Sequence, residues 1–235
     1  GLNPDLRSAS GLSGGAAAKM HTAVLQGRSH FGSLFGNAMA MALAVAESNS
    51  CMGQIVAAPT AGSCGVLPAA LISVMEDKHI DETDIVMALF TASAIGMVIA
   101  KNASISGAEG GCQAEIGTAS AMAAGALTEV LGGSPDMVCS SVAIALKNIL
   151  GLVCDPVAGL VEVPCIKRNA MGVSNAFTAC ELACAGITSA IPTEEVIQSM
   201  KQIGQSLSPT LRETAEGGLA ATPTGCRLCK EIFGK

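Results

Sequence analysis

The chain has 235 residues; half of them are hydrophobic, only 2% are aromatic, and Trp and Tyr are absent. Its formal net charge of −6 offers no attraction to phosphate backbones, and five Phe residues provide little for base stacking, so we expect no nucleic-acid partner. The length suits one domain over residues 1–235, whose core must be built from Ala, Val, Leu, Ile and Met.

Helices account for the predicted secondary structure, since no run of alternating residues predicts a strand. The segments with the length and the Ala, Leu and Met content of helices are, in chain order, 35–50, 66–76, 82–101, 113–131, 136–150, 170–190 and 194–205. Start signals precede some of them: Asp81, Ser134 with Pro135, and Thr193 before two Glu residues. The sequence therefore predicts an all-α fold, a single compact helical domain.

Two apolar stretches raise the question of a membrane. Residues 48–75 carry no charge, but Pro59, Gly62 and Pro68 break helix continuity at their centre, and the run 85–100 is short for a span. Neither a secretory leader nor an initiator Met opens the chain, which indicates a truncated N-terminus. We expect helices buried nearly all round in a protein that does not enter the membrane.

Ten cysteines without a secretory leader favour a reducing compartment, the cytoplasm, where thiols serve as metal ligands, catalytic groups or core residues rather than in disulfides. Cysteines in apolar helical stretches are expected to be small core residues; these are Cys51, Cys139, Cys180 and Cys184. The last two are one helical turn apart and could instead share a metal.

Cys112, Cys154 and Cys165 differ, because each lies in or beside a loop rich in Gly or Pro. Loops free of helical constraint can direct three sulfurs at one point, and glycines leave room for a bulky inorganic group. The spacings fit neither a zinc finger, which uses tight pairs, nor a ferredoxin. Spacing alone leaves the nature of this three-cysteine site open.

Four blocks carry a resemblance to a known family: "APTAGSCG" at 58–65, "GAEGGCQAEIG" at 107–117, "LGLVCDPVAGLVEVPCIKRN" at 150–169 and "SNAF" at 174–177. They resemble the α chain, or catalytic domain, of the iron–sulfur L-serine dehydratases, over essentially the whole chain. The resemblance implies glycine-rich loops that converge on a [4Fe–4S] cluster, which Gly110 and Gly111 allow the chain to approach. The implied ligands are Cys112, Cys154 and Cys165.

Three ligands on a four-iron cluster leave one iron open, and the resemblance implies that this iron acts as a Lewis acid on the hydroxyl of L-serine. A base removes the Cα proton, and the products are pyruvate and ammonia. Members of the family also carry an α/β domain, fused or as a separate β chain, which the sequence lacks. We therefore expect a β-chain partner, an oligomer, and weak activity of this chain alone.

The substrate carboxylate needs a receptor, and two loops run into predicted helices whose N-terminal N–H groups would bind an anion. The loop "TAGSCG" contains Ser63 and Gly65, which the family resemblance favours for carboxylate contact. The loop "SGLSGG" contains Ser13 and Gly14, for which simple helix capping is an equal alternative.

The Cα base is open among Lys101, Lys19 and Lys167. A Lys in apolar surroundings is costly unless it is used, and burial would lower its pKa toward a useful value. Each of the three could equally be a cation at a helix end, and the three histidines are weaker candidates.

Two other functional interpretations are alternatives to catalysis at an iron–sulfur cluster. The pair "CRLC" would make the chain a zinc-binding or thiol-redox protein through Cys226 and Cys229, and Ala- and Gly-rich helix faces would suit a non-catalytic partner subunit. In the family reading, the tail over residues 217–235 begins with "GGLAATPTGC", which makes Cys226 a candidate fourth ligand of the cluster, although nine residues follow it.

Overall fold

The computed structural model describes residues 1–234. Within that range the only strand-like pairing is an isolated parallel bridge between Cys154 and Arg212, so the all-α prediction is confirmed. A π-helix, Gln113–Gly117, leads directly into α6. The α-helices are α1 (Ala16–Leu25), α2 (Ser33–Ser50), α3 (Val66–Lys78), α4 (Glu82–Asn102), α5 (Gly107–Gly110), α6 (Thr118–Val130), α7 (Pro135–Lys147), α8 (Cys165–Cys184), α9 (Thr193–Ser206) and α10 (Pro223–Phe233).

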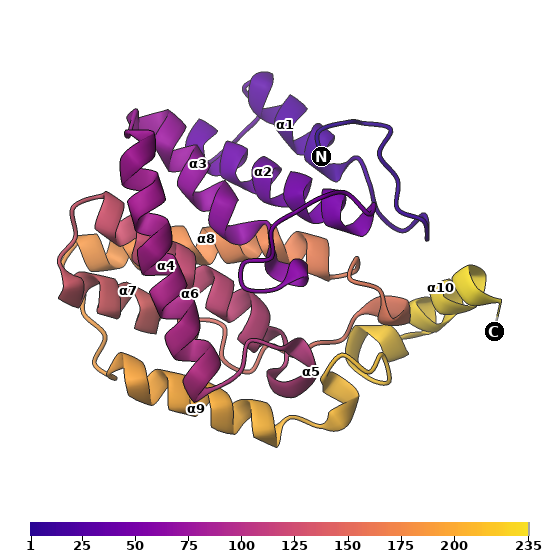
Figure 1. Ribbon diagram of the computed structural model, residues 1–235. Coiled ribbons are helices and arrows are strands. Elements are labelled where there is room, and N and C mark those ends of the chain that lie inside the picture. Colours follow the sequence, from indigo (N-terminus) through magenta and orange to yellow (C-terminus); the bar gives the residue numbers. More distant parts are fainter. Residues whose placement is uncertain (235) are drawn as a thin grey trace.

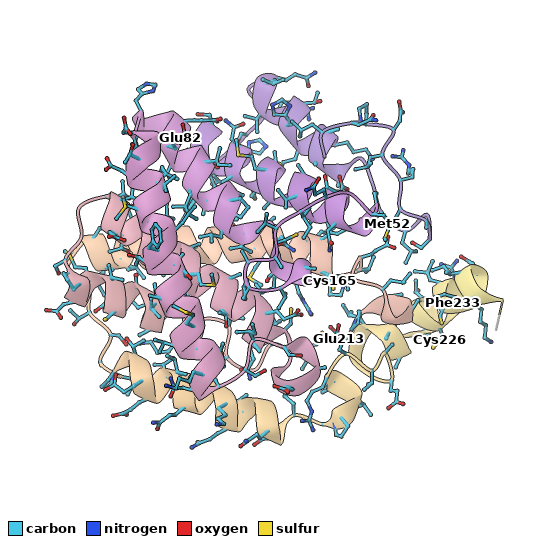
Figure 2. The ribbon with its side chains drawn as sticks, viewed as in Figure 1. Met52, Glu82, Cys165, Glu213, Cys226 and Phe233 are labelled. Carbon is cyan, nitrogen blue, oxygen red and sulfur yellow. The ribbon has the colours of Figure 1, made fainter. Side chains whose placement is uncertain are left out.

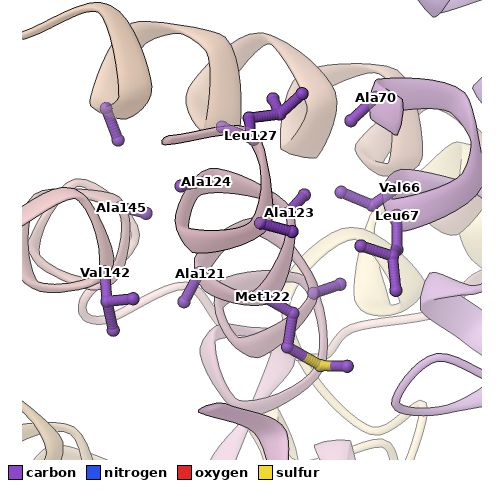
Figure 3. Packing of buried hydrophobic residues seen from close by; sticks show 14 of the residues in the cluster. Val66, Leu67, Ala70, Ala121, Met122, Ala123, Ala124, Leu127, Val142 and Ala145 are labelled. Atoms are coloured by element: carbon purple, nitrogen blue, oxygen red, sulfur yellow. The ribbon is translucent and has the colours of Figure 1, made fainter. Parts of the chain in front are cut away.

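α6 is the central helix, and every residue from Thr118 to Thr128 is buried. The helices α3, α4, α7 and α8 surround it, and Figure 3 shows Val142 of α7 on one side and Val66 of α3 on the other. Because its side chains are small, its neighbours approach closely: a Cβ added to Gly125 would lie 2.3 Å from Cδ1 of Ile95 on α4. Ala and Gly therefore build a dense core with almost no aromatic side chains.

The predicted helices are all present, and the largest boundary error is at α8. This helix begins at Cys165, directly after Pro164, instead of at residue 170, and it ends at Cys184 instead of at 190. Gly186 explains the early end, because its φ of +83° is a left-handed conformation that favours glycine and stops a helix. The helices α1 and α10 and the short helix α5 were not predicted.

Two of the predicted helix starts are confirmed and one is wrong. Asp81 and Ser134 accept hydrogen bonds from backbone N–H groups in the first turns of α4 and α7, at 2.8 and 3.4 Å. Thr193 is already the first residue of α9, and Pro192 precedes it as the N-cap. The Thr193 hydroxyl instead donates to the carbonyl of Cys139 (2.8 Å) and thereby ties α9 to α7.

Segments that are far apart in the sequence lie together on one side of the bundle (Figure 1). The turn before α3, the short helix α5, the start of α8 and the segment before α10 are all found there. These four segments therefore share one loop-rich side of the bundle.

α4 departs from the expectation that the helices are buried nearly all round. Only 28% of its most apolar 18-residue window is buried. In the part of the chain that the structure describes, α4 is the one helix that is long and apolar enough, by length and composition, to cross a membrane. The expectation is confirmed for α6 and wrong for α4.

Candidate cysteine-lined active site

Three sulfurs from separate segments come together on the loop-rich side. Cys112 precedes the π-helix, Cys154 lies in the loop after α7, and Cys165 is the first residue of α8. Burial raises the pKa of all three thiols, to about 11 for Cys112 and about 12 for Cys165. After burial, a negative charge on Cys112 is the next cause that raises the pKa of both Cys154 and Cys165. The three thiols are therefore electrostatic neighbours in one site.

Glycine is required where the chain passes these thiols. A Cβ added to Gly107 would lie 2.7 Å from Oε2 of Glu115 and 3.0 Å from Sγ of Cys154. In the pair Gly110–Gly111, the second residue has φ +76°, and a Cβ there would lie 2.9 Å from the carbonyl oxygen of Leu152. The pair thus makes room for neighbouring backbone, and Gly107 is the glycine that borders a sulfur.

Gln113 holds the Cys112 loop in place. Its side chain is buried; Nε2 donates to the carbonyl of Met200 (2.9 Å) and Oε1 accepts from the N–H of Gly151 (2.9 Å). Its backbone N–H donates to the carbonyl of Leu152 (2.9 Å). A buried amide costs free energy unless both its ends are paired. Because this one is paired, it fixes α9 and the loop after α7 against Cys112.

One cation lies among the thiols, and it was not predicted. Arg168 donates to the carbonyl of Val153 (2.9 Å) and forms an ion pair of 3.0 Å with Asp155. Burial raises the pKa of the Cys112 thiol, and the positive charge of Arg168 opposes the effect. The signal in the sequence is helical spacing, since Arg168 follows Cys165 by three residues and shares its face of α8.

Glu115, in the π-helix, brings a carboxylate to the same place. Its Oε1 accepts a hydrogen bond from Oγ1 of Thr60 (2.8 Å), and its Oε2 is the atom that a Cβ on Gly107 would meet. Burial raises the pKa of Glu115, the bond from Thr60 opposes this, and the charge of Glu213 adds to it. A half-buried carboxylate with a raised pKa is suited to accept a proton. The predicted base candidates did not include it.

The polar groups of the loop before α3 form hydrogen bonds within the chain. Ser63 is fully buried, and its Oγ lies 3.0 Å from Oγ1 of Thr60. The N–H of Gly65 donates to Oδ1 of Asn169 (2.9 Å), whose Nδ2 donates to the carbonyl of Cys165 (3.0 Å). The N–H group predicted to receive the substrate carboxylate therefore already has an acceptor.

The second predicted receptor for the substrate carboxylate is also occupied by side chains of the protein itself. The first two N–H groups of α1 donate to the two carboxylate oxygens of Glu47, at 2.9 and 3.1 Å, and Glu47 is buried. Ser13 donates to the buried Glu162, and Gly14 has φ +128°. The start of α1 does bind a carboxylate, as its loop predicts, but the carboxylate is that of Glu47.

All three lysines proposed as the base are exposed: Lys19 on α1, Lys101 at the end of α4 and Lys167 in the first turn of α8. None of the three is therefore buried, as the base candidate was expected to be.

The cysteines expected in the core are only partly there. Cys180 is buried and Cys51 is half-buried, whereas Cys139 and Cys184 are exposed. The sulfurs of Cys180 and Cys184 are 4.0 Å apart. Across residues 1–234, however, no group of three or more His, Cys, Asp or Glu side chains is placed to hold a single metal ion. The zinc interpretation is therefore not favoured.

The tail passes the thiols, but Cys226 lies away from them. The N–H of Glu213 donates to the carbonyl of Cys154 (2.8 Å), so the tail is bonded to one cysteine loop. Cys226 is exposed on α10, and its thiol faces the carbonyl of Ala220 at 3.8 Å. Figure 2 shows Cys226 farther out along the tail than Glu213 and Cys165.

Comparison with known protein families identifies the family of the chain. Residues 1–220 match the family described as "Serine dehydratase alpha chain". The chain belongs to this family. The matched residues include the loop before α3, the three cysteines and the tail segment beside Cys154.

Named relatives of this serine dehydratase alpha chain are highly similar in sequence. "Probable L-serine dehydratase, alpha chain" of Bacillus subtilis is 56% identical over 227 residues, which cover 97% of this chain and 76% of the relative. "L-serine dehydratase, alpha chain" of Peptoniphilus asaccharolyticus is 48% identical over 219 residues, 93% of this chain and 75% of the relative. "L-serine dehydratase" of Streptomyces coelicolor is 48% identical over 187 residues, 79% of this chain and 41% of the relative.

The residues of this alpha chain fit an iron–sulfur cluster. All ten cysteines are free. The buried Cys112 and Cys154 and the half-buried Cys165 come from three separate segments, and the charge of Arg168 lies beside them. Soft thiolates are the ligands that such clusters use. Each thiolate of a cluster binds a different iron, so the three need not converge on a single point as the ligands of one metal ion must.

Proposed function

We propose that the chain is the catalytic α chain of an L-serine dehydratase, a lyase that converts L-serine to pyruvate and ammonia with a [4Fe–4S] cluster held by Cys112, Cys154 and Cys165. One observation carries the proposal: three thiols from separate segments are electrostatic neighbours beside the carboxylate of Glu115. The relatives support the substrate, because their names are those of L-serine dehydratases. When bound, the cluster supplies a Lewis-acidic iron for the substrate hydroxyl.

In this proposal Glu115 accepts the Cα proton, in place of the exposed lysines. Thr60 holds one carboxylate oxygen at 2.8 Å, which leaves the oxygen on the Gly107 side to take the proton. Burial raises the pKa of this carboxyl, so it takes up a proton more readily than an exposed Glu. Ser63 acts as a positioning residue, because its hydroxyl lies 3.0 Å from that of Thr60.

Arg168 balances charge in the same proposal. Three buried thiolates would repel one another, and a guanidinium beside Cys112 reduces that repulsion. Its ion pair with Asp155 holds it there. The side chain therefore orients the cysteine loops and has no part in moving the proton.

The proposal includes a β-chain partner and a cytoplasmic location. Two of the relatives are named alpha chains, and the chain covers only 41% of the Streptomyces coelicolor relative, so most of that protein lies outside the matched part. Ten free cysteines suit a reducing compartment.

The test is analysis of anaerobically prepared protein, alone and mixed with a β chain. We expect about four irons and four sulfides per chain, pyruvate formation from serine that requires them, and higher activity with the β chain. A colourless protein with one zinc per chain, or a cluster-loaded complex that leaves serine unchanged, would contradict the proposed function. Full turnover by the isolated chain would contradict only the β-chain partner.

A further inference from the structure

The outer face of α4 is an exposed apolar surface that the proposed function leaves unexplained. α4 crosses the front of the bundle in Figure 1, and Phe90 and Met97 on it are 68% and 64% exposed. The other large apolar side chains exposed on this helix are Val86, Met87, Leu89 and Val98. Contiguous apolar faces of this kind mark surfaces that another molecule covers.

This face is symmetric about the middle of the helix. Successive residues of an α-helix are about 100° apart, so Val86, Phe90, Met97 and Lys101 fall along one line. The small pair Ser93–Ala94 lies midway between Phe90 and Met97. If a second α4 crosses antiparallel at the small pair, Phe90 of each helix meets Met97 of the other, a favourable contact between an aromatic ring and sulfur.

The charges at the two ends of α4 favour the same arrangement. Glu82 and Asp84 lie in its first turn, and Lys101 lies in its last turn. In an antiparallel pair, Lys101 of each copy lies opposite Val86 of the other, one helical turn from Glu82. A parallel pair would bring like charges together and align the two helix dipoles unfavourably.

An apolar groove runs beside this face. It has a volume of about 210 Å³ and is lined by side chains of α4, α7 and α9 that include Ala94, Val98, Val142 and Ile197. Its lining is mainly aliphatic, so it can accept an apolar side chain of a second copy.

We propose that α4 is the contact between two copies of this chain, packed antiparallel about a two-fold axis that passes between Ser93 and Ala94. A two-fold interface uses the same surface on both partners and must therefore be self-complementary. The apolar line, the small central pair and the opposite charges at the ends meet that requirement. Neither a bilayer nor an unrelated protein would require the two halves of the helix to match.

The first test measures the mass of the purified protein by light scattering. We expect twice the chain mass of 23.4 kDa for the natural sequence, and monomers for the double variant Phe90→Glu, Met97→Glu. Phe31→Glu is the matched control, because Phe31 is 81% exposed outside α4, and this variant should stay dimeric. A monomeric natural protein, or a double variant that stays dimeric, would overturn the proposal.

The second test does not depend on disruptive substitutions. Ser93→Cys places a thiol at the two-fold axis, so mild oxidation should link two copies, whereas Ser206→Cys, exposed on α9, should not add a link beyond that of the natural protein. Lys101→Glu should weaken the dimer severalfold, and adding Glu82→Lys should restore it. No link at position 93, or monomers that bind phosphatidylcholine vesicles through α4, would overturn the proposal in favour of another occupant.

Discussion

Arg168 and Asp155 form an ion pair of 3.0 Å that is almost closed to solvent, with side chains 14% and 5% exposed. The second carboxylate oxygen of Asp155 accepts the N–H of Leu219 at 2.8 Å. Arg168 also donates to the carbonyl of Val153, beside Cys154, at 2.9 Å. One ion pair therefore joins α8, the Cys154 loop and the tail.

Asp155→Ala should destabilise the chain and release its tail. The change leaves a buried guanidinium without its partner, which costs about 3–5 kcal/mol of unfolding free energy. Chemical denaturation measures that loss, and limited proteolysis should show faster cleavage after Ser206. Glu231→Ala is the control, because the pair of Glu231 with Arg227 is exposed on α10 and should contribute little. Equal stability of the two variants would contradict the structural role of Asp155.

Gly107→Ala should damage the site and leave the bundle intact. The added Cβ would lie 2.7 Å from Oε2 of Glu115 and 3.0 Å from Sγ of Cys154, so one of them must move. A displacement of that size in a catalytic site lowers turnover by about 100-fold. The control is Gly117→Ala, whose Cβ would find its nearest neighbours at 3.8 and 3.9 Å. Serine turnover that is equal in the two variants would show that Gly107 does not border the site.

Glu115→Gln should keep the iron and lose the reaction. Gln has the same shape and can still accept a hydrogen bond from Thr60, but it cannot take up the Cα proton. We expect kcat to fall by about 10²–10⁴-fold with the iron content unchanged. Glu109→Gln, an exposed Glu in α5, should keep full activity. A Glu115→Gln enzyme with normal kcat would show that another residue is the base.

Cys112→Ser, Cys154→Ser and Cys165→Ser should each lose the iron. A hydroxyl is a poor substitute for a soft thiolate on iron. Cys139→Ala, at an exposed position on α7, should retain full iron and sulfide by anaerobic analysis. Iron lost from Cys139→Ala and kept in Cys154→Ser would refute the ligand assignment.

The cluster-free chain should lose stability in alkali. The pKa of Cys112 is raised from 9.0 to about 11 and that of Cys165 to about 12, so between these values and 9.0 the unfolded thiols ionise while the folded ones stay neutral. The unfolded state then binds fewer protons, and stability falls by up to about 1.4 kcal/mol per pH unit for each thiol. Urea unfolding from pH 8 to 10.5 measures this slope. Cys112→Ser should make it shallower; an unchanged slope would contradict the raised pKa.

Local signals in the sequence made much of the fold predictable. The N-caps Asp81 and Ser134 act within one turn of their own helices, and the apolar content of α6 reflects its all-round burial. The start of α8 was predicted too late because Cys165 follows a Pro- and Gly-rich loop. A helix extended back to Cys165 would have placed Arg168 and Asn169 on its face, at the third and fourth following positions.

The site was predictable only in part, for a physical reason. The three cysteines lie in distinctive blocks, so sequence alone could group them. The bond from Thr60 to Glu115 joins positions 55 apart, and the bond from Glu47 to the start of α1 joins two helices. Such contacts depend on how the helices pack, and no local sequence pattern predicts them. For the same reason the exposure of Lys101 could not be foreseen.

The π-helix Gln113–Gly117 sets the angular position of Cys112 relative to the central helix α6. A π-turn holds more residues than an α-turn, so removing one residue from this segment would let the helix path of α6 continue as a regular α-helix. The residues just before the deletion would then turn by about 100° about the axis of α6. Cys112 would turn away from the other two thiols, and the buried side chains next to it in the chain would lose their packing. One extra residue in this helix therefore ties the geometry of the thiols to the packing of the bundle.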